Sequence, residues 1–285
     1  MQKDSGKWYP VSGLRLLSSD SLGVRSFCVY VDTGIERIII DPGLDIAPLR
    51  FDLPPHPLEI ERFYELKSRI MQHLETADVV IISHFHHDHF AKELIPMYKG
   101  KRLIMKDPQR NINFMQKKRV REITDVIKDY EIADGREFRF KGGRIKFSKP
   151  LPHGTTPAVV VSTFIETNRF KLLHTSDISG PIEEEALGFI LEMKPDILIL
   201  DGPALYINKK HRDAFLKNMD IIFEKLPDVK LVIDHHTTRD PGWRNELGSI
   251  SKKAITFAGY NGLEDQPLEG MRKHLWETGT RDQFR

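Results

Sequence analysis

The sequence predicts an α+β protein in which mixed β-sheets are covered by helices. Short apolar runs alternate with amphipathic stretches along the chain, and this alternation is typical of sheets that bury their faces under helices. Hydrophobic residues make up 40% and charged residues 29% of the 285 positions, which is the balance of a globular protein. Because no low-complexity stretch or Gly/Ser-rich linker interrupts the chain, we expect a single domain over residues 1–285.

The elements follow from local patterns. Apolar runs between turn signals predict strands, and apolar residues that recur every three or four positions predict helices. Prolines at 54, 55 and 57 break the chain just before the first helical pattern. We expect strands at residues 25–31, 36–40, 79–82, 102–105, 137–140, 144–147, 158–165, 170–173, 197–200 and 230–233. We expect helices at 58–74, 111–130, 182–193 and 210–225, and helical structure after the strand 230–233 to the end.

Composition limits the classes of function. With 43 basic and 41 acidic residues the net charge is only +2, so overall charge gives no argument for a nucleic-acid or membrane partner. The strongest apolar runs, 79–82 and 197–200, are four residues long, far too short to span a bilayer. Cys28 is the single cysteine and no signal peptide is evident, so we expect a cytoplasmic protein without disulfides or thiolate metal ligands. Abundant Lys, Arg and Glu favour a thermophile.

Five predicted strands are followed by residues that can bind a metal. These residues are Asp41, His84, His174 with Asp177, Asp201, and Asp234 with His235 and His236. Ligands of α/β folds bind beyond the carboxyl ends of the strands, so the five endings indicate one shared site. Aspartate also favours ordinary turns, which could account for Asp41 and Asp201 but not for the histidines.

The segment from residue 83 to residue 89 is the strongest single signal. It contains four histidines and an aspartate: His84, His86, His87, Asp88 and His89. Imidazole together with carboxylate suits zinc, and less exclusively Mn²⁺ or Fe²⁺. Ligands this close in sequence are more easily divided between two neighbouring ions than gathered on one tetrahedral ion. A histidine-rich surface turn is the alternative, but the position directly after a buried strand argues against it.

The pattern His-x-His-x-Asp-His resembles the signature of the metallo-β-lactamase superfamily. The other motifs of that superfamily occur in order, with Asp41 in the first, His153 in the third, Asp177 in the fourth and His235 in the last. The resemblance covers roughly residues 11–240, and the chain is similar to a poorly characterised, mainly archaeal group within the superfamily. It implies an αββα sandwich: two packed mixed sheets, helices on both outer faces, and a site along one edge.

The resemblance also implies a ligand set. It assigns the first metal to His84, His86 and His153, and the second to Asp88, His89 and His235. Asp177 would bridge the two ions and Asp41 would orient a ligand from behind, so catalytic roles are expected for Asp41, Asp88 and Asp177. Two divalent ions about 3.5–4 Å apart would share a hydroxide that acts as the nucleophile. Zinc is the expected metal, with Mn²⁺ or Fe²⁺ as alternatives.

Several residues near these motifs allow two interpretations. His235 and His236 compete for the last ligand position, and we favour His235. His87 lies between two ligands and should point away from the metals. His174 either supports the site or packs in the core, and Asp201 either supports the site or ends a turn.

Positive charge near the motifs is also ambiguous. Arg239 could meet an anionic group of the substrate, although a solvated surface arginine is the commoner outcome. The basic segment 99–121 could track phosphates. A solvated helix face is favoured there, because the net charge is near neutral and no aromatic interleaving is evident.

The sequence therefore predicts a metal-dependent hydrolase, with a phosphodiester or another small molecule as its substrate and no membrane partner. The alternatives are a lactone or thioester hydrolase, a mononuclear-iron oxygenase of the same fold, and a non-catalytic nucleic-acid-binding protein. Only 57 residues, 178 to 234, separate Asp177 from His235. That length leaves no room for the large inserted domain of the superfamily's nucleases or for a flavodoxin domain.

Overall fold

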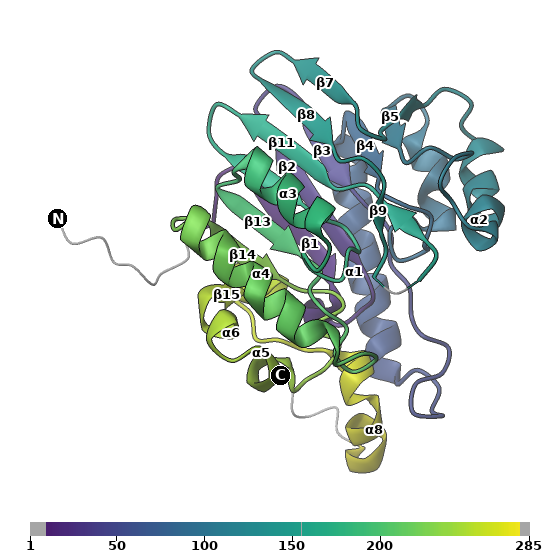
Figure 1. The fold of residues 1–285 in the computed structure, drawn as a ribbon. Helices are drawn as coiled ribbons and strands as arrows, with labels where there is room; N and C mark the ends of the chain where they lie inside the picture. The colour runs from purple at the N-terminus through teal and green to yellow at the C-terminus, as the bar shows by residue number, and fades with distance from the viewer. Residues whose placement is uncertain (1–9, 155, 280–285) are drawn as a thin grey trace.

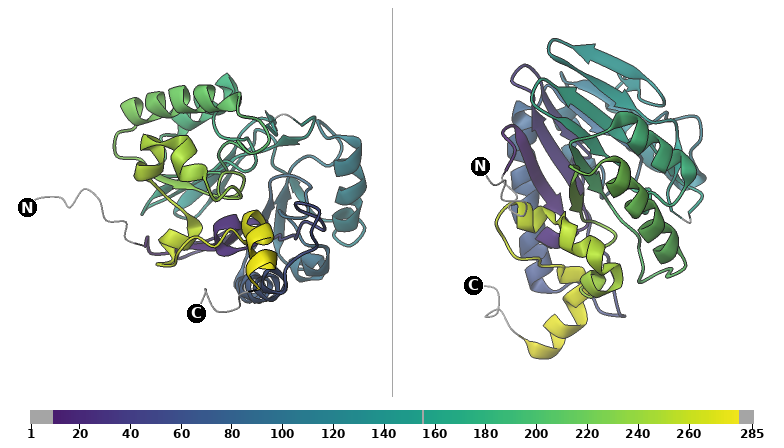
Figure 2. Two further views of the ribbon diagram at one scale, coloured as in Figure 1. Left: turned by 90° about the horizontal axis from the view of Figure 1, so that it is seen from below. Right: turned by 60° about the vertical axis from the view of Figure 1, so that its left-hand side comes forward.

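The computed structural model describes residues 10–154 and 156–279 and shows four layers (Figure 1). Two β-sheets pack face to face in the middle. Seen from below, α3 and α4 cover one outer face, and α1 and α8 lie on the opposite side (Figure 2). This arrangement confirms the predicted αββα sandwich with two mixed sheets. Within the described ranges, no helix combines the length and the apolarity needed to cross a membrane.

The first sheet has six strands in the order β1-β2-β3-β4-β5-β6. The strands are β1 (Leu14–Ser19), β2 (Phe27–Asp32), β3 (Arg37–Ile40), β4 (Val79–Ile82), β5 (Arg102–Met105) and β6 (Glu131–Ile132). β1, β2 and β3 pair antiparallel, whereas β3, β4, β5 and β6 pair parallel. The parallel half directs the carboxyl ends of β3 and β4 to one edge of the sheet.

The second sheet has seven strands in the order β15-β14-β13-β12-β11-β8-β7. They are β7 (Glu137–Phe140), β8 (Gly143–Phe147), β11 (Thr163–Thr167), β12 (Lys171–His174), β13 (Ile197–Leu200), β14 (Lys230–Ile233) and β15 (Ala254–Ile255). β12 to β15 are parallel, and the remaining pairs are antiparallel. A small separate ribbon pairs β9 (Leu151–Pro152) with β10 (Val159–Val160).

Local sequence features determine where the helices begin, as α1 illustrates. α1 starts at Pro57 after a capping box, in which the His56 ring accepts from the N–H of Leu58 and Glu59 accepts from the N–H of His56. The α-helices are α1 (Pro57–Thr76), α2 (Phe114–Thr124), α3 (Glu184–Met193), α4 (His211–Lys225), α5 (Trp243–Leu247), α6 (Ser249–Lys253), α7 (Phe257–Tyr260) and α8 (Leu268–Thr278). Two 3-10 helices are η1 (Asp20–Leu22) and η2 (Lys92–Tyr98).

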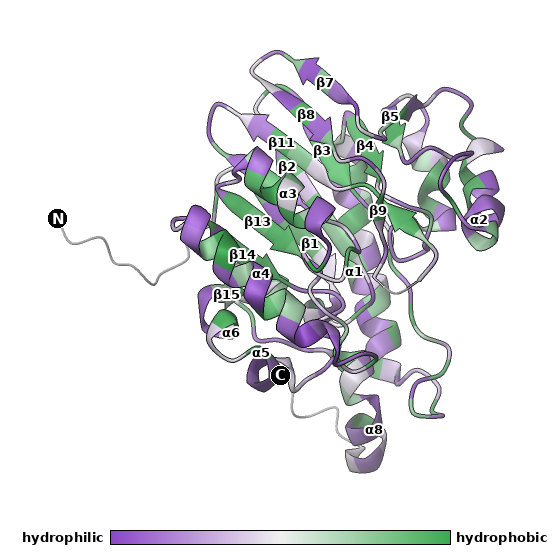
Figure 3. Ribbon diagram, viewed as in Figure 1, coloured by the Kyte–Doolittle hydropathy of each residue, from purple (hydrophilic) through white to green (hydrophobic). Residues whose placement is uncertain are grey.

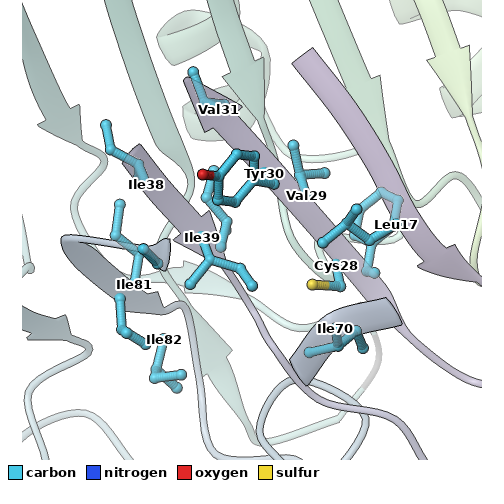
Figure 4. Packing of buried hydrophobic residues seen from close by; sticks show 14 of the residues in the cluster. Leu17, Cys28, Val29, Tyr30, Val31, Ile38, Ile39, Ile70, Ile81 and Ile82 are labelled. Atoms are coloured by element: carbon cyan, nitrogen blue, oxygen red, sulfur yellow. The ribbon is translucent and has the colours of Figure 1, made fainter. Parts of the chain in front are cut away.

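The core lies in three sandwiched layers because strand side chains alternate between the two faces of a sheet. In β13, Ile197 and Ile199 face the first sheet, whereas Leu198 and Leu200 pack under α3 and α4. Figure 4 shows the same alternation in β2, where Cys28 lies near Ile70 of α1 while Val29, the next residue, points the other way. Cys28 is fully buried. Figure 3 shows β4 and β13 as hydrophobic throughout, as expected for strands that are covered on both faces, and β14 is hydrophobic after its exposed first residue, Lys230.

Three sequence predictions need correction. The helix expected at 111–130 is shorter, because Asn113 caps its start and it ends at Thr124 before β6. The strand expected at 158–165 is divided into β10 and β11, because the chain leaves the sheet where the N–H of Val161 bonds to the carbonyl of Ser83. β1, β6, β9 and β15 were not predicted. The helical end is confirmed only as far as α8, since residues 280–285 lie outside the described ranges.

Candidate metal centre

The carboxyl ends of strands from both sheets converge at one edge of the sandwich. β3 and β4 lead into Asp41 and His84, and β12, β13 and β14 lead into further candidate residues. Three residues at these exits have left-handed backbone, with φ of 49° at Asp41, 57° at Ser176 and 60° at His235. Non-glycine residues rarely adopt this conformation, and the cases that occur tend to cluster at functional sites. The strand ends are therefore bent to aim side chains at one point.

Asp177 lies at that point and is buried. Its Oδ2 is 3.1 Å from Nε2 of both His89 and His153. Two further Nε2 atoms, of His236 and His84, lie 3.5 and 3.6 Å from the same oxygen. The other oxygen, Oδ1, is 3.4 Å from Nε2 of His235. Five histidines, from both sheets and from the β9–β10 ribbon, thus surround one carboxylate.

Three overlapping groups could each hold a metal ion, since their ligand atoms lie within 4.8 Å of one another. The first contains His84, His86, His153 and Asp177; the second contains Asp88, His89 and His235; the third contains Asp177, His235 and His236. All seven residues predicted as ligands lie in these groups. His87 belongs to none of the groups found among the described residues. Its Nε2 lies 3.4 Å from Glu122 of α2, so the ring points away from the metal ligands, as expected.

Two buried atoms in the centre have no hydrogen-bond partner among the described residues. They are Oδ1 of Asp177 and Nε2 of His235. Leaving a buried polar atom unsatisfied costs about 1–3 kcal/mol, so such atoms indicate a missing partner. An imidazole nitrogen and a carboxylate oxygen are both good ligands for zinc. The residues present therefore fit a divalent metal ion.

Three buried carboxylates each hold the outer nitrogen of an inward-pointing histidine. The pairs, with the distance from Nδ1 to oxygen, are Asp41 with His89 (2.8 Å), Asp20 with His235 (2.7 Å) and Asp201 with His236 (2.9 Å). Carboxylates in this position fix the ring and direct its Nε2 toward the metal side. Asp41 was expected there, and Asp201 supports the site besides capping the turn at Ser179. Asp20 was missed because β1, whose end it follows, was not predicted.

His84 is held differently, by hydroxyl groups. Its Nδ1 lies 3.1 Å from Oγ of Ser83 and 3.3 Å from Oγ of Ser176. Ser83 also donates to Asp41 over 2.6 Å, which links the two supports. His174 contributes one step further out: its Nδ1 accepts from the N–H of Ser176 and its Nε2 lies 3.1 Å from the carbonyl of Phe27. His174 therefore supports the site from within the core.

The histidines divide electrostatically into two kinds. Burial, together with the neighbouring imidazoles, lowers the pKa of His84 well below its usual value and that of His86 to about 3. Burial alone would also lower the pKa of His89 and His235, but adjacent carboxylates outweigh it. Asp177 and Asp41 raise the pKa of His89 well above its usual value. Asp177 and Asp20 raise the pKa of His235 to about 9.

A cavity of about 100 Å³ opens beside the cluster. His153 and His236 line its inner end, and its wall includes Tyr206 and Arg239. The expectation of a solvated Arg239 was wrong, because this side chain is buried. It donates to Asp20 over 2.7 Å and to the hydroxyl of Tyr206 over 3.3 Å. Arg239 thus connects the wall of the cavity to the carboxylate that holds His235.

Comparisons with known proteins agree with this geometry. Residues 36–235 match the family described as Beta-lactamase superfamily domain. The chain is 39% identical to the UPF0282 protein of Korarchaeum cryptofilum over 92% of this chain and 93% of that protein. It is 35% identical to the UPF0282 protein of Aeropyrum pernix over 93% and 98% of the two chains. Several of these archaeal relatives come from thermophiles, which fits the composition.

Among solved structures, the fold is similar to an isothiocyanate hydrolase from Delia radicum gut bacteria. The TM-score is 0.53 at 14% identity, over 82% of this chain and 94% of that one. At this identity the likeness concerns the fold. The family match and the UPF0282 relatives both cover most of the chain. It therefore belongs to the metallo-β-lactamase superfamily, as one of its UPF0282 proteins, with the fold and the His/Asp cluster of that superfamily's metal-dependent hydrolases.

Proposed function

We propose that this metal-dependent hydrolase holds two divalent ions, with zinc preferred, and hydrolyses phosphodiesters. The observation that carries the proposal is the position of Asp177. It belongs to a group with His84, His86 and His153, and its free Oδ1 faces Nε2 of His235 in the second group. One carboxylate that faces ligand atoms on both sides is suited to two neighbouring ions.

The first ion would be held by His84, His86 and His153, and the second by Asp88, His89 and His235, with Asp177 between them. When bound, two such ions would supply the Lewis acidity that activates water and stabilises negative charge on substrate oxygens. The chain supplies orientation. Asp41 and Asp20 hold the Nδ1 atoms behind the second group, so that its Nε2 lone pairs face inward without further reorganisation.

The size and the lining of the cavity favour a small anionic group of the substrate. Its volume of about 100 Å³ is well below the 300–1,000 Å³ of pockets that enclose drug-sized ligands. Tyr206, Asn208 and His211 line the wall with groups that can donate hydrogen bonds, beside the guanidinium of Arg239. A phosphate-sized group is therefore favoured there over a bulky bicyclic lactam.

The test is a substrate panel of activated phosphodiester, lactone, thioester and β-lactam, assayed with zinc, manganese and iron. We expect turnover of the phosphodiester, loss of that turnover in His86→Ala, and full activity in His274→Ala, which removes an exposed histidine on α8. Turnover of the lactone or thioester alone would reject the substrate assignment. Saturation with one iron and consumption of dioxygen would reject the hydrolase in favour of an oxygenase.

A further inference from the structure

The outer face of α2 combines positive charge with an exposed aromatic ring. Gln116, Val120 and Ile123 form its buried face. On the opposite side, Phe114, Lys118 and Arg121 follow the i, i+4, i+7 spacing that places residues in one stripe, and Lys117 lies beside them. We call Phe114, Lys117, Lys118 and Arg121 the α2 surface. Phe114 is 79% exposed, the largest fraction of any large hydrophobic side chain in the described ranges.

The cations of the α2 surface differ from others in the same basic segment. Arg102 and Lys106 are neutralised by Glu131 and Asp134, at 2.6 Å in each pair. Lys117, Lys118 and Arg121 are exposed, and none of them forms an ion pair with a residue of the described part of the chain. The segment therefore contains ion-paired cations on and just after β5, and cations without an ion pair to the described residues on α2. An overall charge of +2 conceals this local excess.

α2 also lies beside the metal centre. Its Gln116 donates to the carbonyl of Val159 over 3.5 Å, and Val159 pairs with Pro152, the neighbour of His153. On the flank of the helix, Glu122 lies 3.4 Å from His87, within the histidine segment. The helix α2 is thus attached, through its inner face and flank, to both loops that carry ligands of the proposed first ion, and the α2 surface lies on its outer side.

We propose that the α2 surface binds a single-stranded nucleic acid, with its cations on phosphates and Phe114 stacked on an unpaired base. Lys and Arg that neutralise phosphates supply sequence-independent affinity, and an exposed aromatic ring adds stacking that every base can provide. The cavity beside the cluster is small, so most of a bound polymer would lie on the surface outside it. That the bound strand is also cut rests on the proposed phosphodiesterase function.

An anionic membrane is the other partner that a basic face with an exposed Phe could attract. An interfacial helix, however, inserts its apolar face into the lipid. The apolar face of α2 is committed to the core through Val120 and Ile123, and Phe114 with Met115 is all that remains exposed. The structure therefore favours nucleic acid.

The test measures binding rather than cleavage. A fluorescent, nuclease-resistant 2′-O-methyl oligonucleotide of about twelve nucleotides, within the range of single-strand site sizes, is titrated with the full-length protein at several salt concentrations. The triple variant K117A/K118A/R121A should raise Kd about tenfold or more and reduce the slope of log Kd against log salt by about 2, since each lost phosphate contact contributes about 0.7. F114A should raise Kd about fivefold with the slope unchanged.

The matched control is K141A/K217A/K252A, which removes three exposed lysines elsewhere on the molecule and should leave Kd unchanged. Equal weakening in both triple variants would overturn the proposal, as would tight binding to phosphatidylserine vesicles with no binding to the oligonucleotide. Melting temperatures and turnover of bis(p-nitrophenyl) phosphate should stay unchanged in all variants. If that small diester is not hydrolysed by the parent protein while RNA binding depends on α2, the proposed function fails and the α2 surface stands.

Discussion

The two principal ligand groups of the centre differ in what holds their histidines. In the first group, the outer nitrogen of His84 meets only serine hydroxyls. In the second, the outer nitrogens of His89 and His235 meet the carboxylates of Asp41 and Asp20. A hydroxyl orients an imidazole without charging it, whereas a buried carboxylate also stabilises the imidazolium. The first group therefore has a histidine that is oriented without being charged. In the second group, the carboxylates both orient the histidines and favour their protonated form.

The consequence is a difference in readiness for metal. His84 and His86 have lowered pKa values, so they are neutral near pH 7 and offer free lone pairs. His89 and His235 have raised pKa values, so without metal they hold protons near pH 7. A metal ion must displace those protons to bind. We therefore expect the first group to bind more readily and the second to bind with proton release.

The largest effect should come from Asp177→Ala, because Asp177 contacts both groups. The variant should lose at least one of the two ions, and its turnover should fall by about 10³-fold or more, as expected when a shared ligand of a two-metal site is removed. Elemental analysis of metal-saturated protein gives the stoichiometry. Asp220→Ala, on the exposed face of α4, is the matched control. Saturation of the unmutated protein at one ion would reject the bridging role.

The next effect separates two adjacent histidines. Both rings face Asp177, at 3.4 Å for His235 and 3.5 Å for His236. His235 also lies 3.7 Å from Asp88 of the second group, whereas His236 lines the cavity. We expect His235→Ala to weaken binding of the second ion by about 10²-fold or more and to abolish turnover, because a direct ligand contributes more than an outer one. His236→Ala should retain both ions. Zinc titrations of the two variants measure this difference. If His236→Ala lost the second ion and His235→Ala kept it, His236 would be the ligand.

The metal ligands and the residues that hold them from behind differ in how far the sequence alone predicts them. Four of the seven predicted ligands come from one short segment after β4, and their spacing within that segment identifies them. Asp20 acts on a histidine 215 positions away, and no local pattern expresses such a contact. The unpredicted β1 shows the same limit, because its strand LRLLSS departs from regular apolar alternation and is fixed by pairing with β2. Local periodicity predicts helices and strands. A residue such as Asp20, which holds a metal ligand from behind, is brought there by tertiary contacts.

A moderate effect should follow from removing the charge behind the second group. Asp41→Asn and Asp20→Asn keep the shape but lose the negative charge, so each should weaken the second ion by about 10–100-fold, the usual range for such supports. Ser176→Ala, behind His84, should change binding only a few-fold.

The readout that distinguishes positioning from general damage is the number of protons released on zinc binding. It should fall in both Asn variants, because each loses one of the two carboxylates that raise the pKa of its histidine, although Asp177 remains. Asp20→Asn also leaves Arg239 without its partner, so its melting temperature must be compared with that of Asp41→Asn. Unchanged proton release with weakened binding in both variants would indicate a purely structural role for the carboxylates.

A further contrast is a pH dependence that only the second ion should show. In the metal-free protein the pKa of His235 is about 9, above its ordinary value of 6.5. Its proton is therefore bound at pH 7 and is lost as pH rises through 9. Affinity for the second ion should rise with pH by up to about tenfold per unit for each proton displaced, and should level off above pH 9. Affinity for the first ion should change little over this range, since the pKa of His86 is about 3.

Calorimetric titration with zinc, in two buffers of different protonation enthalpy, resolves the two binding steps and counts the protons of each. At pH 6 the competition with protons should leave mainly one ion bound, and at pH 8.5 two ions should bind at the same zinc concentration. Equal proton release in both steps would show that the carboxylates behind His89 and His235 do not charge these rings. The contrast between the two groups would then be one of geometry alone, and the order of metal loading would have to come from the number of ligands rather than from their protonation.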